Sequence, residues 1–308
     1  MTKREVLRSF ALWCALCACL FSARPALALD VDPVENVSVF AETIFFQGYF
    51  RHIVYLRPTV PATTDRVPAI VLLHYLRGDA PGMANLTGPG RLVRDFGAWV
   101  ILPEAIKGIW HSSNCCSRDN PVDDVAFLAH LIDLGVARFP LDSKRIYMAG
   151  YSDGAHMAEL FACMRPEKIA AATLVAASIH SLDATLCTPT LPTPIQFLRG
   201  SDDALVPYNG DSFYKSAAFT AALWAQIDGC TGAPLQSDLP DAVDDGTSAH
   251  LVSYANCNAG SAVDFYTANG AGHTWPGALG FSSALGRTSE DINATSVMWE
   301  FLRRFSRP

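Results

Sequence analysis

The chain has 308 residues, of which 50% are hydrophobic and 17% charged, and its formal net charge is −7 at pH 7. This composition can fill a substantial core and excludes an intrinsically disordered chain. The acidic balance argues against a protein that binds nucleic acid or an anionic membrane surface, since either would need a basic patch.

The first 28 residues form a distinct segment. It begins with basic side chains, continues with an apolar run from Phe10 to Phe21 and ends in Ala26-Leu27-Ala28. This order predicts a secretory signal peptide cleaved after Ala28, and hence a secreted or periplasmic protein without a membrane anchor. One alternative is an anchor, although the run is shorter than the ~20 residues that span a bilayer. Another is a lipoprotein signal at Leu16–Cys19, which falls early. Residues 29–308 carry 19 basic and 29 acidic side chains, a net charge of −10.

Short apolar runs then alternate with amphipathic ones. The runs that predict strands are Ile53–Leu56, Ala69–His74, Trp99–Leu102, Arg145–Ala149, Ala171–Ala176, Ile195–Leu198, Val252–Tyr254 and Val263–Tyr266. The segments that predict helices are Asp123–Ala137, Ser152–Met164 and roughly Glu290–Phe305. This alternation predicts a single α/β domain over residues 29–308, with a mainly parallel sheet and helices on both faces. The Asp-rich stretch Gly232–Ser248 is expected to be a surface loop.

Residues 150–156 read GYSDGAH, with a glycine two positions to each side of Ser152. By chance alone, a G-x-S-x-G string occurs in roughly one chain in ten. Here it lies between a predicted strand and a predicted helix, which is the setting of a nucleophile elbow. Ser152 is therefore the candidate nucleophile.

A serine hydroxyl needs a base to take its proton, and the base needs a carboxylate to orient it. The carboxylate candidates are Asp202 and Asp203, which follow a predicted strand. Of the downstream histidines, His180 precedes both, His250 lies in the polar stretch, and His273 follows the last strand in GAGHTWPG. Taken alone, His273 is more simply interpreted as a surface histidine, and the Asp202–Asp203 pair as part of a turn. The shared chain order favours His273 as the base.

The tetrahedral intermediate of such a reaction needs hydrogen-bond donors for its oxyanion. One donor is expected to be the N–H of Asp153, the residue after the nucleophile. The other is expected from the loop LHYLRGD, from the backbone of Leu76 or Tyr75.

Outside the first 28 residues there are six cysteines: Cys115, Cys116, Cys163, Cys187, Cys230 and Cys257. An even number in an exported chain favours disulfides, and no C-x-x-C pair or nearby histidine cluster supports a metal site. The spacing alone fixes no pairing.

Taken together, the strings LHYLRGD, W-x-x-x-x-C-C, VDDVAFL, RIYMAGYSDGAHMA, GSDDALVPYNG and GHTWPG are informative. From about Arg51 to the C-terminus the chain resembles the secreted polyhydroxybutyrate depolymerase and feruloyl esterase group of the α/β-hydrolase superfamily. The group carries its acid in a G-x-x-D-x-x-V-P string, which here selects Asp203, and its base in GHTWPG, which is His273.

The resemblance implies more. Cys230 is expected to pair with Cys257, and Cys163 with Cys187, while the state of Cys115 and Cys116 stays open. Trp275 is expected to border the acyl or alcohol pocket, with plain packing as the alternative. No metal or organic cofactor is needed.

The chain also departs from the group. Tyr75 replaces the usual glycine of His-Gly and is expected either to narrow the acyl pocket or to shift which N–H donates, and Asp153 stands where Asn is common. Polymer-degrading members of the group often carry a linker and a substrate-adsorbing domain; neither is expected here, which favours soluble esters or short oligomers.

We therefore expect a secreted serine esterase that acts on hydroxyalkanoate (polyhydroxybutyrate-type) oligomers or polyester. The first alternative is a feruloyl or acetyl xylan esterase acting on plant polysaccharide. The second is a secreted serine peptidase, or a relative that binds without catalysis.

Overall fold

The computed structural model describes residues 30–60, 66–112, 122–278, 280–281 and 283–308. Val31–Pro308 form one compact unit. The predicted signal peptide, residues 1–28, lies outside the described residues, as do Cys115 and Cys116. The architecture below concerns Val31–Pro308 alone.

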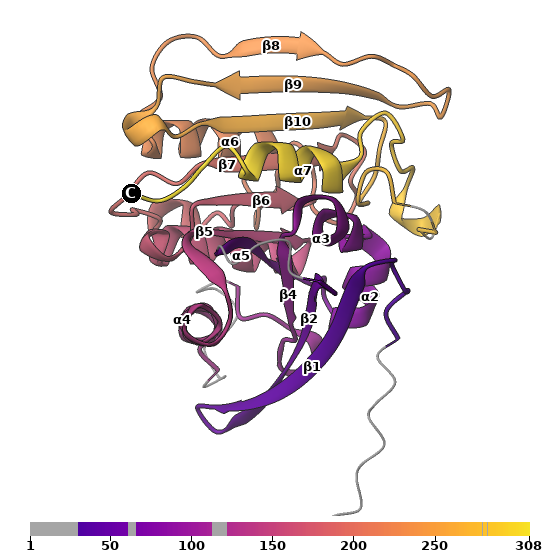
Figure 1. Ribbon diagram of the computed structural model, residues 1–308. Helices are drawn as coiled ribbons and strands as arrows, with labels where there is room; N and C mark the ends of the chain where they lie inside the picture. Colours follow the sequence, from indigo (N-terminus) through magenta and orange to yellow (C-terminus); the bar gives the residue numbers. More distant parts are fainter. Residues whose placement is uncertain (1–29, 61–65, 113–121, 279, 282) are drawn as a thin grey trace, which may run out of the picture. The chain divides into compact units, whose positions relative to one another are not determined.

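A single sheet runs through this unit, and its strands follow the order β1-β2-β4-β3-β5-β6-β7-β10-β9-β8 (Figure 1). The strands are β1 (Val37–Phe46), β2 (Tyr49–Pro58), β3 (Val67–Leu73), β4 (Trp99–Pro103), β5 (Leu141–Tyr151), β6 (Ala171–Val175), β7 (Ile195–Gly200), β8 (Leu235–Asp238), β9 (Ser248–Tyr254) and β10 (Val263–Asn269). The run from β4 to β10 is parallel, and antiparallel strands flank it on both sides. The predicted α/β class with a mainly parallel sheet is confirmed.

The α-helices are α2 (Ala80–Thr87), α3 (Gly90–Phe96), α4 (Asp124–Arg138), α5 (Asp153–Met164), α6 (Ala217–Ile227) and α7 (Ala294–Leu302). Short 3₁₀ turns lie at Ile106–Gly108, Pro166–Lys168, Asp183–Thr185, Asn258–Gly260 and Ser283–Leu285. Buried side chains of α4, α5 and α6 form one core with the strands, including Phe127, Phe161 and Trp224. Figure 1 shows α7 in front of the sheet beside α3, where Trp299 packs on Phe96.

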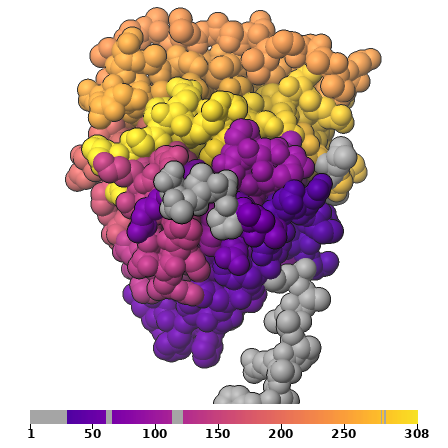
Figure 2. Space-filling view, viewed as in Figure 1, coloured from indigo at the N-terminus to yellow at the C-terminus, as the bar shows by residue number. Residues whose placement is uncertain are grey.

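The C-terminal segment closes the front of the sheet. In Figure 2 its yellow atoms abut the purple atoms around α2 and α3. Thr295 donates a hydrogen bond to the Thr87 carbonyl at 2.6 Å, so α7 is joined to the end of α2. This contact links positions far apart in the sequence and holds the segment that follows His273.

All the expected strands are present; most are longer than expected, whereas β6 ends one residue earlier, at Val175, and β3 ends at Leu73. Two edges of the sheet differ from what the sequence predicted. β1 was not expected; it pairs with β2 along ten positions and lies at one edge. The stretch Gly232–Ser248, expected to be a loop, contains β8, which pairs with β9 at the other edge. The side chains of β8 are all exposed, so this strand carries no apolar alternation from which it could be recognised.

Candidate active site

The predicted elbow is present between β5 and α5. Ser152 has φ 57° and ψ −118°, a backbone conformation that side chains rarely adopt and that often marks a functional site. A Cβ atom on Gly150 would lie 2.2 Å from the Gly154 carbonyl oxygen, and one on Gly154 would lie 2.3 Å from the Leu73 carbonyl oxygen. Both glycines are therefore required by close backbone approach, which explains the G-x-S-x-G string.

Three predicted side chains meet beside this elbow. His273 Nε2 lies 2.8 Å from Ser152 Oγ, and His273 Nδ1 lies 2.8 Å from Asp203 Oδ2. Asp203 follows β7 and His273 follows β10, and these two parallel strands are neighbours in the sheet. A Cβ atom on Gly200 would lie 2.2 Å from the Gly272 carbonyl oxygen, so the two loops meet without space for a side chain.

Asp203 is held on all sides. Its side chain is buried, and its Oδ1 accepts hydrogen bonds of 2.9 Å from the backbone N–H groups of Leu205 and Val206. The buried guanidinium of Arg199 lies 3.7 Å from Oδ2. Asp202, in contrast, is exposed and accepts from the Ser201 hydroxyl. Of the two candidates, only Asp203 contacts His273.

The other histidines occupy different places. His250 lies on β9, where its Nδ1 is 2.7 Å from Asp238 Oδ1 on β8. His180 lines the cleft at Ser152. Among the described residues, no hydrogen bond joins His180 to the serine. The ring of His273 is further fixed through its backbone, because the Tyr151 hydroxyl donates to the His273 carbonyl at 2.7 Å.

A cleft of about 570 Å³ opens at Ser152, and Leu76, Asp153 and His273 are among the residues that line it. Between described residues, neither the Leu76 N–H nor the Asp153 N–H donates a hydrogen bond. Both are the donors expected for an oxyanion. The loop that carries Leu76 is fixed by His74, whose Nε2 accepts from the Ala105 N–H at 3.0 Å. Burial lowers the pKa of His74, which keeps its ring neutral and suited to accept this bond.

The Asp153 carboxylate points away from its own N–H and binds the cleft wall. It accepts hydrogen bonds from the Trp110 N–H at 2.9 Å and from the Ser112 hydroxyl at 3.1 Å. Burial raises the pKa of Asp153 to about 6, and these two donors oppose that rise. Asp153, where Asn is common in the group, therefore keeps its backbone N–H free to donate. Its carboxylate also holds the cleft wall at Trp110 and Ser112.

Asp124 is a structural residue that the sequence reading did not single out. It forms a fully buried ion pair with Arg51 at 2.7 Å, and its other oxygen accepts from the backbone N–H of His111 at 2.9 Å. The Arg51 guanidinium also lies 3.6 Å from the ring centre of Phe127. Asp124 lies in the string VDDVAFL, but its partners Arg51 and His111 are distant in the sequence and no spacing indicates them.

Two aromatic residues were expected at the pocket. Tyr75 lines a second hollow next to Ser152, together with Tyr151 and Phe281. Trp275 does not line the cleft or this hollow: its side chain is 1% exposed, and its Nε1 donates to Thr295 Oγ1 at 3.1 Å. The expectation that Trp275 borders a substrate pocket is therefore wrong. The alternative given for this residue, packing in the core, is what the structure shows.

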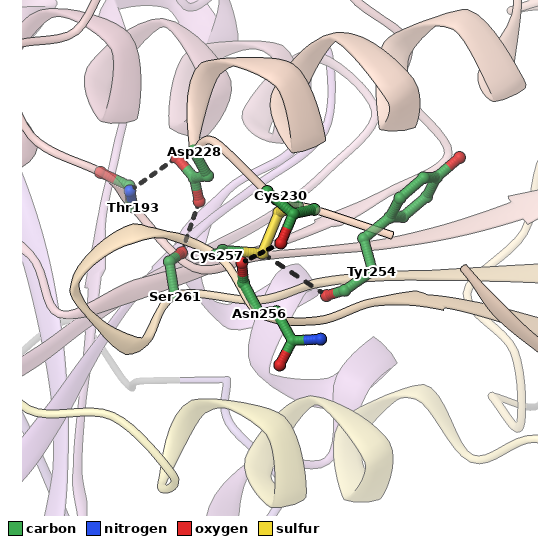
Figure 3. The surroundings of a disulfide bond; sticks show 8 residues. Thr193, Asp228, Cys230, Tyr254, Asn256, Cys257 and Ser261 are labelled. Atoms are coloured by element: carbon green, nitrogen blue, oxygen red, sulfur yellow. Dashed lines mark hydrogen bonds between the residues drawn. A yellow bond between two sulfur atoms is a disulfide. The ribbon is translucent and has the colours of Figure 1, made fainter. Parts of the chain in front are cut away.

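The structure contains disulfides between Cys163 and Cys187 and between Cys230 and Cys257. Figure 3 shows the second one beside Asp228, which accepts hydrogen bonds from the Thr193 N–H and the Ser261 hydroxyl. No helix among the described residues is both long and apolar enough to cross a bilayer. Within the same residues, no three His, Cys, Asp or Glu side chains are grouped so that they could hold a metal ion.

Comparisons with known proteins extend this picture. Residues 50–186 match the family described as esterase PHB depolymerase. Feruloyl esterase B of Piromyces equi is 29% identical over 257 residues, which are 78% of this chain and 42% of that protein. The putative esterase NocK of Nocardia uniformis subsp. tsuyamanensis is 27% identical over 293 residues, 88% of this chain and 84% of that protein. The chain thus spans less than half the length of the first of these relatives.

Among solved structures, an acetyl xylan esterase from Aspergillus awamori is similar, with a TM-score of 0.59 and 19% identity over 77% of this chain and 94% of that one. The chain is an α/β-hydrolase by fold. The match of residues 50–186 to the esterase PHB depolymerase family agrees with the resemblance found in the sequence. This family and the named relatives are described as esterases, which agrees with the predicted enzyme class, a carboxylic-ester hydrolase.

Proposed function

We propose that this chain is a serine esterase in which Ser152 is the nucleophile, His273 the general base and Asp203 the carboxylate that orients the base. The observation that carries the proposal is the continuous contact from Asp203 through His273 to Ser152, with both hydrogen-bond distances at 2.8 Å. This contact lies in a cleft, where an ester can reach the serine oxygen. It also argues against a relative that only binds its ligand.

In the proposed reaction, Ser152 Oγ attacks the ester carbonyl while His273 Nε2 takes its proton. Asp203 keeps the Nδ1 proton of His273 on the side away from the serine and stabilises the imidazolium that forms. His273 then passes the proton to the leaving alcohol, and an acyl group remains on Ser152. A water molecule, activated by the same imidazole, releases the acid and restores the serine.

The N–H groups of Asp153 and Leu76 are assigned as the hydrogen-bond donors to the negatively charged oxygen of the tetrahedral intermediate. The support for this assignment is that both groups lie on the cleft and have no hydrogen-bond acceptor among the described residues. Asp153 also begins α5, so the positive end of the helix dipole faces the same charge. Preorganised donors of this kind typically contribute a factor of about 10²–10³ each to the rate.

Two substrate classes are candidates. The family description, esterase PHB depolymerase, favours the expected hydroxyalkanoate oligomers or polyester. The names of the similar proteins, a feruloyl esterase and an acetyl xylan esterase, favour esters of plant polysaccharide. Comparing hydroxybutyrate oligomers with methyl ferulate and acetylated xylan separates the two classes, and the class with the higher kcat/KM is the assignment.

We further propose that the chain is exported and that residues 1–28 are removed. The disulfides support an oxidising compartment, since such bonds are rare in reducing ones. Mass spectrometry of the protein from the outside of the producing cell is expected to find Leu29 at the N-terminus. Retention of the first residues on the mature protein would contradict this assignment.

The esterase proposal is tested with p-nitrophenyl acetate and with a peptide anilide. Wild type is expected to hydrolyse the ester much faster than the anilide, and a fluorophosphonate probe is expected to label Ser152. Ser152→Ala is expected to lose both turnover and labelling while its melting temperature stays close to wild type. Turnover that survives in Ser152→Ala would overturn the assignment, and preference for the anilide would indicate a peptidase.

A further inference from the structure

A second cavity, which we call the side chamber, lies between α5 and the segment that follows β6. Its walls include Leu160, Met164, Ile179 and Leu186, and the Cys163–Cys187 disulfide joins its two sides. The volume of the side chamber is about 130 Å³. An engineered apolar cavity of about 150 Å³ binds benzene, so the side chamber can take a group about as large as one ring.

The side chamber adjoins the cleft at Ser152. Ser112, His156 and His180 line both spaces. His156 follows Ser152 by four residues and Glu159 by seven, so they lie about 6 Å and 10 Å further along the axis of α5. A group attached to an acyl carbon on Ser152 can therefore extend past His156 towards Glu159.

His156 carries an unused polar atom at this passage. The residue is 6% exposed, and its Nε2 is buried without a hydrogen-bond partner among the described residues. Burial and the neighbouring His180 lower the pKa of His156 well below its usual value, and a hydrogen bond with the Ser178 backbone engages the ring. The ring is neutral, so Nε2 is a bare acceptor. A buried acceptor without a donor costs free energy that a ligand donor would recover.

Glu159 supplies the complementary group. Its Oε1 accepts from Trp224 Nε1 at 2.9 Å, and no hydrogen bond joins its Oε2 to another described residue. Glu159 is buried, and this burial raises its pKa to about 8. At neutral pH the carboxyl group is therefore protonated and has an O–H to donate. The catalytic contact described above uses neither His156 nor Glu159.

The second hollow at Ser152 is suited to the leaving alcohol. The hollow lined by Tyr75 and Phe281 also includes His273, which must give its proton to the alcohol oxygen. The side chamber does not include His273. The alcohol part of the ester therefore belongs on the His273 side, and the side chamber remains for the acyl part.

We propose that the side chamber is an acyl-binding subsite for an apolar acyl group that carries a hydroxyl at its far end, with His156 Nε2 accepting from this hydroxyl and the Glu159 carboxyl donating to it. The proposal rests on the proposed serine esterase function. His156 and Glu159 are then the residues that determine acyl specificity, because a chain without the hydroxyl leaves both polar groups unpaired.

The test compares methyl p-coumarate with methyl cinnamate, which differ by one hydroxyl, and uses p-nitrophenyl acetate as a reference ester. Wild type is expected to favour the coumarate by about tenfold or more in kcat/KM, as loss of a buried hydrogen bond requires. In His156→Phe and in Glu159→Met this ratio is expected to fall to about one. Glu159→Gln is expected to keep it, because an amide can accept from Trp224 and donate to the ligand.

The matched control is His130→Phe, the same change at an exposed position of α4, and its coumarate preference is expected to equal that of wild type. Should His156→Phe not fold, the two Glu159 variants decide the question alone. Hydrolysis of all three esters without a coumarate preference would overturn the side chamber proposal and leave the esterase function standing. A wild-type protein that hydrolyses none of them would overturn both.

Discussion

The Asp153 carboxylate accepts a hydrogen bond from the backbone N–H of Trp110 at 2.9 Å, so the residue next to Ser152 ties the elbow to the wall of the cleft. The folded chain buries this carboxyl and raises its pKa from 3.8 to about 6. A raised pKa means that the folded state holds the proton more tightly than the unfolded state. The stability that Asp153 contributes therefore falls as the pH rises from about 4 to above 6.

Asp153→Asn is expected to remove this dependence. Relative to wild type, the variant should gain about 2–3 kcal/mol in the free energy of unfolding between about pH 4 and pH 8. Urea denaturation across this range measures the difference. Asp202→Asn, at an exposed position, is the control and should show no such trend. A stability difference between Asp153→Asn and wild type that is constant with pH would contradict the argument.

Asp203→Asn is expected to lower kcat by a factor on the order of 10⁴, by analogy with the same change in serine proteases. An amide at this position favours the wrong tautomer of His273, because its NH₂ group can donate where the carboxylate accepts. Asp202→Asn is expected to change kcat only slightly, since Asp202 bonds to Ser201 and not to the base. Steady-state kinetics on p-nitrophenyl acetate decides, and the reverse order of effects would show that the acid has been misassigned.

Asp124→Asn is expected to lower the free energy of unfolding by about 3–5 kcal/mol, because it leaves the buried Arg51 without its counter-charge. The adjacent Asp123 provides a matched control: it caps α4 through the Ala126 N–H, and Asn caps a helix about as well. Asp123→Asn should therefore change stability by only a few tenths of a kcal/mol. Equal losses in the two variants would show that the ion pair is not the source of the effect.

The two disulfides allow a paired test of the side chamber. Replacing Cys163 and Cys187 with Ala is expected to lower stability by about 3 kcal/mol, and replacing Cys230 and Cys257 by a similar amount, because the loops they close are similar in length. Only the first pair lines the side chamber, so only the first double variant should also lose preference for methyl p-coumarate. Retention of the preference in the first, or its loss in the second, would contradict the assigned role.

The sequence predicted the parts of the site that depend on chain order and strand ends. Ser152, Asp203 and His273 each follow a strand of one parallel sheet, and parallel strands bring their carboxyl ends to one edge. The role of the two elbow glycines could also be predicted from the sequence, because their spacing reflects a local requirement of the backbone.

The rest of the site depends on three-dimensional neighbours that no spacing shows. Trp275 lies two residues after His273, but the chain turns there, as the Thr274 N–H bond to the Gly272 carbonyl shows, and the indole packs against Tyr151 and Thr295. The side chamber joins one face of α5 to a segment some twenty residues further along the chain. Only the folded chain places His156 and Glu159 on a shared space.

The bond between Cys163 and Cys187 has a practical consequence for anyone who produces this protein. Inside a reducing cytoplasm the bond would not form, whereas the contact between Ser152 and His273 involves no sulfur. If the proposed side chamber holds the acyl group, the molecules of such a preparation that fold would hydrolyse a two-carbon ester and yet misreport the ester preference. Recombinant material for substrate profiling is therefore best directed to the periplasm or refolded with a glutathione couple.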